Sequence, residues 1–199
     1  MYACAGCDAR ECVKGMKNPP EGCPGLTEAV AQTTPDYQEE ATLRIARVSG
    51  KIAPDHSRSR LEQTMAFARE CGFERLGLAF CVSFCREAAI VARVLRENGF
   101  AVESVMCKVG GLPRDTVGLP GTGRPMCNPL AQARLLNERK TDLNIVMGLC
   151  VGHDTLFLQH SQAPATVLAV KDYANDHNPL SGIRCKQAGR CPAPTSGLT

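Results

Sequence analysis

Cysteine dominates the chemistry that this sequence offers. The chain has 12 cysteines among 199 residues, well above the usage of an ordinary intracellular protein. Four of them lie near the start of the chain with the spacing C-x2-C-x4-C-x10-C: Cys4, Cys7, Cys12 and Cys23. Four thiolates are the number that either a tetrahedral zinc ion or a four-iron, four-sulfur cluster requires.

The segment around these cysteines is rich in glycine and proline and has no hydrophobic periodicity, so we expect it to need a metal in order to fold. Structural zinc sites usually pair two short knuckles, and the second knuckle is missing here. Ferredoxin-type runs end in Cys-Pro, as Cys23-Pro24 does, although their internal spacing is tighter. Residues 1–30 are therefore predicted to form a lobe that holds a 4Fe-4S cluster, with zinc as the alternative. Lys14 and Lys17 would offset part of the thiolate charge.

From residue 31 the pattern is that of an α/β domain. Short apolar runs at 75–80, 101–106, 165–170 and from residue 143 alternate with amphipathic segments at 83–98, 129–140 and 155–161. Two more helices, over 37–48 and from 57 or 59 to 71, precede the first run. Because each crossover between parallel strands needs a helix, we predict a four-stranded, mainly parallel sheet of order 2-1-3-4. The domain is expected to be three-layered and Rossmann-like or flavodoxin-like, to span 31–182, and to be followed by a weakly ordered tail, 183–199.

Cysteines recur where the predicted strands end. Cys81, Cys107 and Cys150 follow the first three strands, and Cys127 precedes a helix that begins at Pro129. The carboxyl ends of parallel strands meet at one edge of a sheet, where ligands bind in such folds. We therefore expect a crevice lined by four thiols, which binds a second metal ion or cluster.

Two other interpretations of this crevice stay open. One cysteine is a reactive nucleophile, with His153 as its base and Asp154 orienting the imidazole, or the thiols are structural. Side chains at the rim are predicted to contact the bound group: Lys108, Asn128, His153 and Lys171. The long segment 112–126, with three glycines and three prolines, has the length of a functional loop.

Charge and composition exclude several classes of protein. The net charge is only +3, and the chain has no Trp and three Tyr, so neither a basic face nor stacking platforms for nucleic acid are expected. The chain begins without the basic and apolar regions of a signal peptide. The longest apolar stretch, 76–84, is too short to span a bilayer. We expect a cytoplasmic protein, with no membrane partner, whose thiols are kept reduced.

Several blocks of this sequence resemble one known family. They are the N-terminal C-x2-C-x4-C, LGLAFC, CKVGG, MCNPLAQARLLN, the long block from Thr141 to Asp172, and HNP. Together they are similar to the bacterial and archaeal domain-of-unknown-function family 1847, over the chain to about residue 185. That family is described as cysteine-rich and presumed metal-binding. The resemblance supports as metal ligands the eight cysteines named above and leaves out Cys71, Cys85, Cys185 and Cys191.

The sequence thus predicts a metal-binding, cytoplasmic redox protein with an N-terminal iron–sulfur cluster and a second cysteine-lined site. Its partner would be a redox protein or a small-molecule substrate. The alternatives are a non-catalytic zinc-binding or metal-delivery module and a thiol enzyme that uses Cys150 or Cys81.

Overall fold

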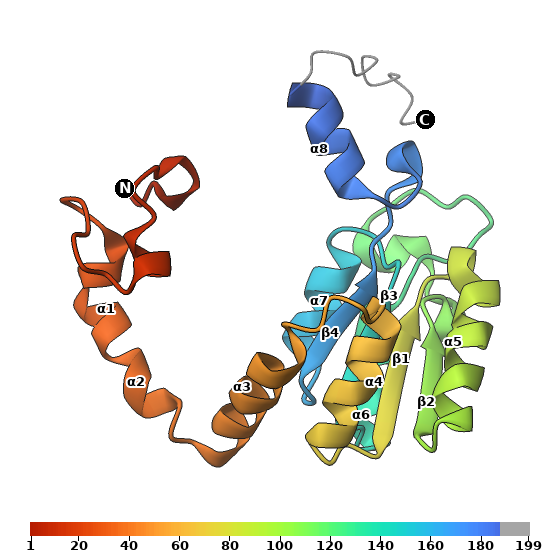
Figure 1. Cartoon of the computed structure of the whole chain (residues 1–199). Helices are drawn as coiled ribbons and strands as arrows, with labels where there is room; N and C mark the ends of the chain where they lie inside the picture. Colours follow the sequence, from red (N-terminus) through yellow and green to blue (C-terminus); the bar gives the residue numbers. More distant parts are fainter. Residues whose placement is uncertain (188–199) are drawn as a thin grey trace. The chain divides into compact units, whose positions relative to one another are not determined.

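The computed structural model describes residues 1–187 of the chain (Figure 1). These residues form two compact units, which divide between Ser57 and Arg58. The helices between residues 30 and 57 therefore group with the cysteine-rich lobe, whereas the sequence places that lobe's end at residue 30.

The larger unit is built on four parallel strands: β1 Arg75–Phe80, β2 Ala101–Met106, β3 Leu143–Met147 and β4 Ala165–Ala169. Their order across the sheet is β2-β1-β3-β4. Phe80 pairs with Met106 on one side and with Met147 on the other, so these three strands end in step. The predicted α/β class, parallel pairing and strand order are confirmed.

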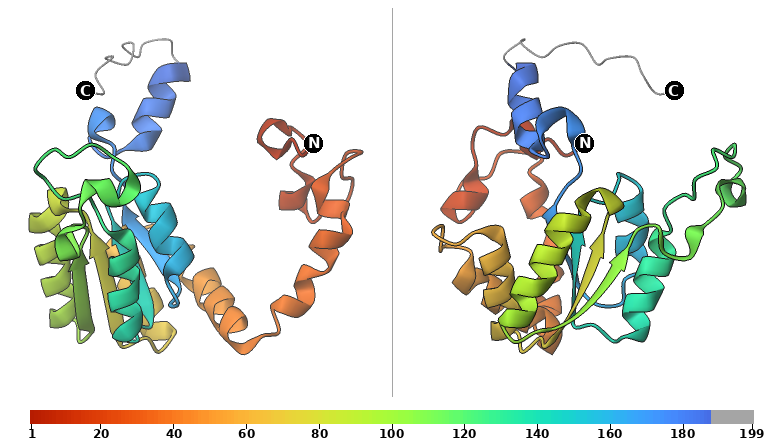
Figure 2. Two further views of the ribbon diagram at one scale, coloured as in Figure 1. Left: turned by 180° about the vertical axis from the view of Figure 1, so that it is seen from behind. Right: turned by 90° about the vertical axis from the view of Figure 1, so that its right-hand side faces the viewer.

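Helices cover both faces of this sheet (Figure 2). On one face lie α4 Arg60–Glu70 and α5 Cys85–Glu97, and on the other lie α6 Pro129–Glu138 and α7 His153–His160. The connections β1–α5–β2, β2–α6–β3 and β3–α7–β4 each carry the chain between parallel strands through a helix, as such connections must. The result is the predicted three-layer arrangement.

The core lies around the two central strands. All five residues of β3 and four of the six in β1 are buried, while β2 and β4 are partly exposed as edge strands. Helix α5 adds Ala88, Val91, Ala92 and Leu95 to the core, at the spacing of one helical face. Apolar residues fill both faces of the central strands, as expected for a sheet covered on both sides.

One polar residue interrupts the apolar run of β3. Asn144 is fully buried and accepts a hydrogen bond from the Thr141 hydroxyl (2.8 Å) while donating one to Ser161 Oγ (2.8 Å). Its side chain fits only because β1 has a glycine opposite: a Cβ on Gly77 would lie 1.9 Å from Asn144 Oδ1. The amide is therefore satisfied inside the core, at the end of the sheet away from the cysteines.

The helix termini follow the local sequence closely. Ser59 and Glu62 form a reciprocal capping box at α4. Asn128 Oδ1 accepts the Ala131 amide at 3.0 Å, and Pro129 occupies the first turn of α6. Helix α7 begins at His153 rather than at the predicted residue 155.

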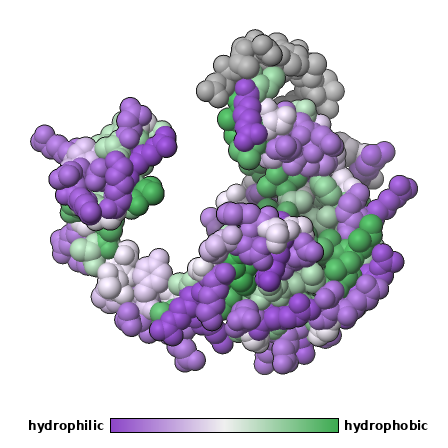
Figure 3. All heavy atoms as spheres, in the orientation of Figure 1, coloured by the Kyte–Doolittle hydropathy of each residue, from purple (hydrophilic) through white to green (hydrophobic). Residues whose placement is uncertain are grey.

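The smaller unit has little core. Short 3-10 turns at Cys4–Gly6, Glu11–Lys14 and Pro24–Leu26 precede α1 Glu28–Ala31, α2 Thr33–Asp36 and α3 Glu40–Ile52. None of residues 1–47 is buried. Hydrophilic residues predominate on the visible surface of this unit (Figure 3). The predicted helix over 37–48 begins at Glu40, because Glu39 is extended and its carboxylate accepts the Thr42 hydroxyl at 2.9 Å.

The described chain ends in α8 Pro179–Gln187. Residues 183–187 of the predicted tail thus belong to a helix, and the rest of that tail, with Cys191, lies outside the described residues. Within residues 1–187, no helix combines the length and apolar character needed to cross a membrane.

Candidate functional site

Each strand of the sheet delivers one reactive side chain to the same edge. Cys81 and Cys107 directly follow β1 and β2, Cys150 lies three residues after β3, and Lys171 lies two residues after β4. Backbone bonds extend the ladder to the cysteines: Cys81 N–H donates to Met147 O (3.0 Å) and Cys107 N–H to Phe80 O (2.8 Å). The rigid sheet therefore positions these groups at its carboxyl edge.

Lys171 joins two of the thiols. Its Nζ lies 2.7 Å from Cys81 Sγ and 3.2 Å from Cys150 Sγ. β1 and β3 are neighbours in the sheet, so the sulfur atoms that follow them are close enough to share one ammonium. The ammonium supplies a positive charge to a pair of groups that become anionic when they ionise.

The other two thiols contact each other directly. Cys127 Sγ lies 3.6 Å from Cys107 Sγ. The Asn128 amide donates to the carbonyl of Cys107 at 2.7 Å, which ties the two chain segments together beside the sulfur atoms. Cys107 Sγ also accepts the Val82 amide at 3.3 Å, so this thiol is anchored from two sides.

The environment shifts the acidity of these groups in opposite directions. Burial alone raises the pKa of the Cys81 thiol, but hydrogen bonds with Lys171 and Ser83 outweigh it and lower that pKa. Burial, together with the nearby Cys127 and Cys81, raises the pKa of the Cys107 thiol to about 12, against the opposing hydrogen bond from Val82. Burial disfavours a charged thiolate and an adjacent ammonium favours it. Cys81 is thus prepared to be a thiolate and Cys107 to stay a thiol.

Lys171 itself stays charged. Burial alone lowers the pKa of its ammonium, but its hydrogen bonds to Cys81 and Cys150 and their charges raise that pKa above the ordinary value. Lys171 and Cys81 therefore stabilise each other's ionised forms.

Cys150 reaches this cluster through a constrained turn. Gly148 has φ +63°, and a Cβ there would lie 2.2 Å from the ring of Phe84. The Phe84 ring is buried and packs against the His177 imidazole with ring centroids 4.7 Å apart. Only glycine allows the chain to turn this closely under an aromatic ring.

The structure brings the four predicted crevice cysteines to one edge, in two pairs. Cys81 and Cys150 share Lys171, and Cys107 contacts Cys127. Among residues 1–187, no group of three His, Cys, Asp or Glu side chains is assembled as ligands for an ion.

The predicted rim residues have varied positions. Lys108 donates to the carbonyl of Pro125, and Asn128 serves as the cap of α6. His153 begins α7, and its buried Nδ1 has no hydrogen-bond partner. Burial, with the positive charges of Lys171 and Lys108, lowers the His153 pKa against the opposing charge of Asp154. Lys171 lies at the centre of the cluster rather than at its rim.

Sequence reasoning missed a polar and aromatic group beside the thiols. The Tyr173 hydroxyl donates to Ser83 Oγ at 2.6 Å, and His177 Nδ1 accepts the Asp172 amide at 3.0 Å. The signals available were the KDY and HNP segments after the fourth strand, which follow a strand end as the cysteines do.

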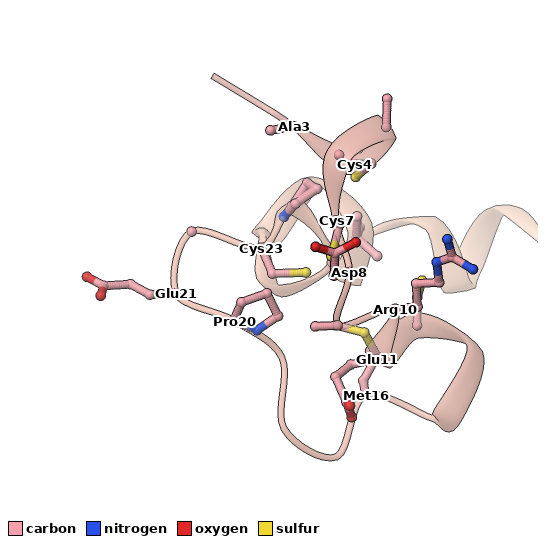
Figure 4. Close-up of a pocket in the computed structure, with 18 of the residues that line it drawn as sticks. Ala3, Cys4, Cys7, Asp8, Arg10, Glu11, Met16, Pro20, Glu21 and Cys23 are labelled. Atoms are coloured by element: carbon pink, nitrogen blue, oxygen red, sulfur yellow. The ribbon is translucent and has the colours of Figure 1, made fainter. Parts of the chain in front are cut away.

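The N-terminal cysteines surround a separate cavity of about 1000 Å³. All four line it, and Figure 4 shows Cys4, Cys7 and Cys23 around it, together with Asp8, Glu11 and Met16. Gly25 lets the Met16 side chain approach, since a Cβ there would lie 2.6 Å from Met16 Cε and 3.6 Å from Cys23 Sγ. Lys14 is expected to offset the charge of the thiolates, but its Nζ forms an ion pair with Glu11 Oε1 at 3.0 Å.

The remaining described cysteines lie outside both groups. Cys71 is fully buried at the end of α4. Cys85 is exposed at the start of α5, with its Sγ 3.7 Å from Met106 Sδ. Cys185 lies in α8.

Comparison with known proteins identifies the family. The sequence profile of a protein family of unknown function, DUF1847, matches residues 23–168. The chain is also 36% identical over 189 residues to the uncharacterised protein MJ0455 of Methanocaldococcus jannaschii, with 92% of this chain and 94% of that protein covered. The residues that match the family profile include Cys23 and the four crevice cysteines, Cys81, Cys107, Cys127 and Cys150. The chain therefore belongs to the DUF1847 family.

Proposed function

We propose that this protein is a redox protein that carries an iron–sulfur cluster in its N-terminal lobe and a second thiolate site in its crevice. The observation that carries the proposal is that four cysteines line one cavity within residues 1–30, none of which is buried. Such a segment lacks the apolar core that would otherwise hold it together, so a bound metal group would supply its folding energy.

The donor set of the lobe fits a cluster. Four soft thiolates suit either zinc or iron–sulfur groups. The lobe sequence favours the cluster, because Cys23 is followed by Pro24, as in ferredoxin-type runs. Cys4, Cys7, Cys12 and Cys23 would be its ligands.

When bound, such a cluster would supply one-electron transfer. The crevice is the second half of the proposal: Cys81, Cys107, Cys127 and Cys150 would hold a metal ion or cluster, or face a small substrate. Lys171 would offset the thiolate charge there. Iron–sulfur clusters and reactive thiols are typical of a reducing compartment, and we propose the cytoplasm.

Anaerobic purification followed by iron, sulfide and zinc analysis tests this function. We expect about four iron and four sulfide per chain from the lobe, and a brown protein. The C12S variant should lose this iron, whereas C85S, which changes an exposed cysteine outside both groups, should keep it. A colourless protein with stoichiometric zinc and no sulfide would refute the proposal and would favour a non-catalytic zinc-binding or metal-delivery module.

A second candidate, a thiol enzyme, is favoured by the contacts of Lys171. A thiolate held by an ammonium at a strand end is a suitable nucleophile. Limiting iodoacetamide, applied to reduced and metal-free protein, should then modify Cys81 or Cys150 well before the other cysteines. Uniform labelling would exclude this candidate.

A further inference from the structure

We propose that Cys107 and Cys127 form a reversible disulfide, and that this pair exchanges electrons with a low-molecular-weight disulfide. The inference goes beyond the proposed function, since it requires no metal in either site. It rests on the direct contact between two thiols that are 20 residues apart in sequence. The backbone amide of Asn128, next to Cys127, donates to the carbonyl of Cys107 and joins the two chain segments.

The geometry allows the bond to form with a small movement. The two sulfur atoms are 3.6 Å apart, and a disulfide bond is about 2.05 Å long, so about 1.5 Å of approach is needed. Rotation of the Cys127 side chain can supply this approach. Cys107 follows the last residue of β2, and the Asn128–Cys107 hydrogen bond holds the backbone of both segments in place.

The same reasoning disfavours the other pair in the crevice. Cys81 and Cys150 each accept a hydrogen bond from the Lys171 ammonium. This contact holds the two sulfur atoms at one ammonium, and forming a disulfide there would disrupt both hydrogen bonds. Cys107 and Cys127 share no such cation in the contacts of the described residues, so their oxidation sacrifices no comparable interaction.

The two partners also differ in access. Cys107 is 1% exposed, whereas Cys127 is partly exposed. A small disulfide can therefore reach Cys127 first, and Cys107 is placed to complete the exchange from the interior. An accessible attacking thiol beside a buried resolving thiol is the arrangement that thiol–disulfide exchange needs.

The proposed reaction has two steps. The Cys127 thiolate attacks one sulfur of the small disulfide RS–SR, whose S–S bond breaks, and one thiolate RS⁻ leaves and takes up the proton lost by Cys127. Cys107 then attacks the Cys127 sulfur of the mixed disulfide while its proton passes to the departing sulfur, which leaves as the second RSH. Two protein thiols are oxidised, and one RS–SR is reduced to two RSH.

Peptide mapping of the full-length protein tests the proposal. Reduced, chelator-treated protein is incubated with oxidised glutathione, trapped with N-ethylmaleimide and digested without reductant. Mass spectrometry should find a Cys107–Cys127 peptide as the main disulfide among residues 1–185. The C107S variant should accumulate glutathione on Cys127, about ten-fold above wild type, because the resolving thiol is absent. The matched control C85S should form the Cys107–Cys127 disulfide as wild type does.

Wild-type mapping alone decides the question if a variant folds poorly. A Cys81–Cys150 peptide in excess, or a statistical mixture of pairs, would overturn the proposal. Iron and sulfide are measured on anaerobic samples from the same preparation. If the expected iron is missing but the Cys107–Cys127 disulfide forms, only the proposed cluster is refuted. If the iron is present but this disulfide does not form, only the disulfide proposal is refuted.

Discussion

Replacement of Gly148 by alanine should damage the crevice from within the core. A Cβ at this position would meet three atoms of the Phe84 ring at 2.2, 2.3 and 2.9 Å, distances that real packing does not allow. The ring is 7% exposed and lies against His177, so it has little free space into which to move. The substitution must therefore displace either the ring or the turn that leads to Cys150.

The cost has two parts. Alanine at φ +63° pays about 1–2 kcal/mol for the left-handed conformation, and forcing extra volume into a packed core adds about 1–3 kcal/mol. G148A should therefore lower the free energy of unfolding by about 2–5 kcal/mol. Gly118 provides a matched control: its backbone is left-handed with φ +71°, and a Cβ there would meet nothing within 4 Å. G118A should cost only the conformational part, about 1–2 kcal/mol.

Urea-induced unfolding followed by circular dichroism measures both variants, since the chain has no Trp for fluorescence. Alkylation of Cys150 in the folded protein provides a second measurement, because a displaced turn separates this thiol from Lys171. Equal stabilities for G148A and G118A would refute the reasoning, as the clash with Phe84 is the difference between the two positions.

Three further outcomes follow from the contacts described. In metal-free protein, K171M should raise the pKa of Cys81, because it removes the ammonium whose effect outweighs that of burial. Alkylation of Cys81 at neutral pH should then be slower, as measured by mass spectrometry of timed labelling reactions. An unchanged rate would show that the contact with Lys171 does not control this thiol. N144L should destabilise the larger unit by about 1–3 kcal/mol, because it removes the buried hydrogen bonds of Asn144 with Thr141 and Ser161. An unchanged urea midpoint would contradict this. Removing metal from the N-terminal lobe should speed tryptic cleavage after Lys14 and Lys17 by about ten-fold or more, since the lobe has no core of its own; electrophoresis of timed digests should show the larger unit intact, and equal cleavage rates with and without chelator would argue against a metal-dependent lobe.

The sequence predicts the sheet well because its signals are local. Each strand is a short apolar run, and in three of them the next residues include a cysteine, so parallel pairing alone places Cys81, Cys107 and Cys150 at one edge. The observed order places the most apolar run, from Leu143, between two neighbours in the sheet, as expected for a strand buried on both faces.

The pairing within the crevice could not be predicted in this way. The sequence pattern around a lysine that follows a strand is the same whether its ammonium faces solvent or two thiols. The contact between Lys171 and Cys81 depends on how β4 is aligned with its neighbour in the sheet, which the sequence pattern does not specify. The contact between Cys107 and Cys127 depends on where a long irregular loop returns, and no periodicity encodes that. Asn128 illustrates the same limit, since a cap and a ligand-binding amide have the same residue type.

The loop between β2 and α6 begins and ends at the two cysteines that touch. It carries only two short 3-10 turns, Val109–Gly111 and Arg114–Val117, so its backbone has few internal constraints. A bond between Cys107 and Cys127 would turn this open loop into a closed ring of about 20 residues, which removes conformational entropy from the unfolded chain worth about 3 kcal/mol. Oxidation of these two sulfur atoms would then raise the free energy of unfolding of the whole larger unit, including the parts that lie far from the crevice.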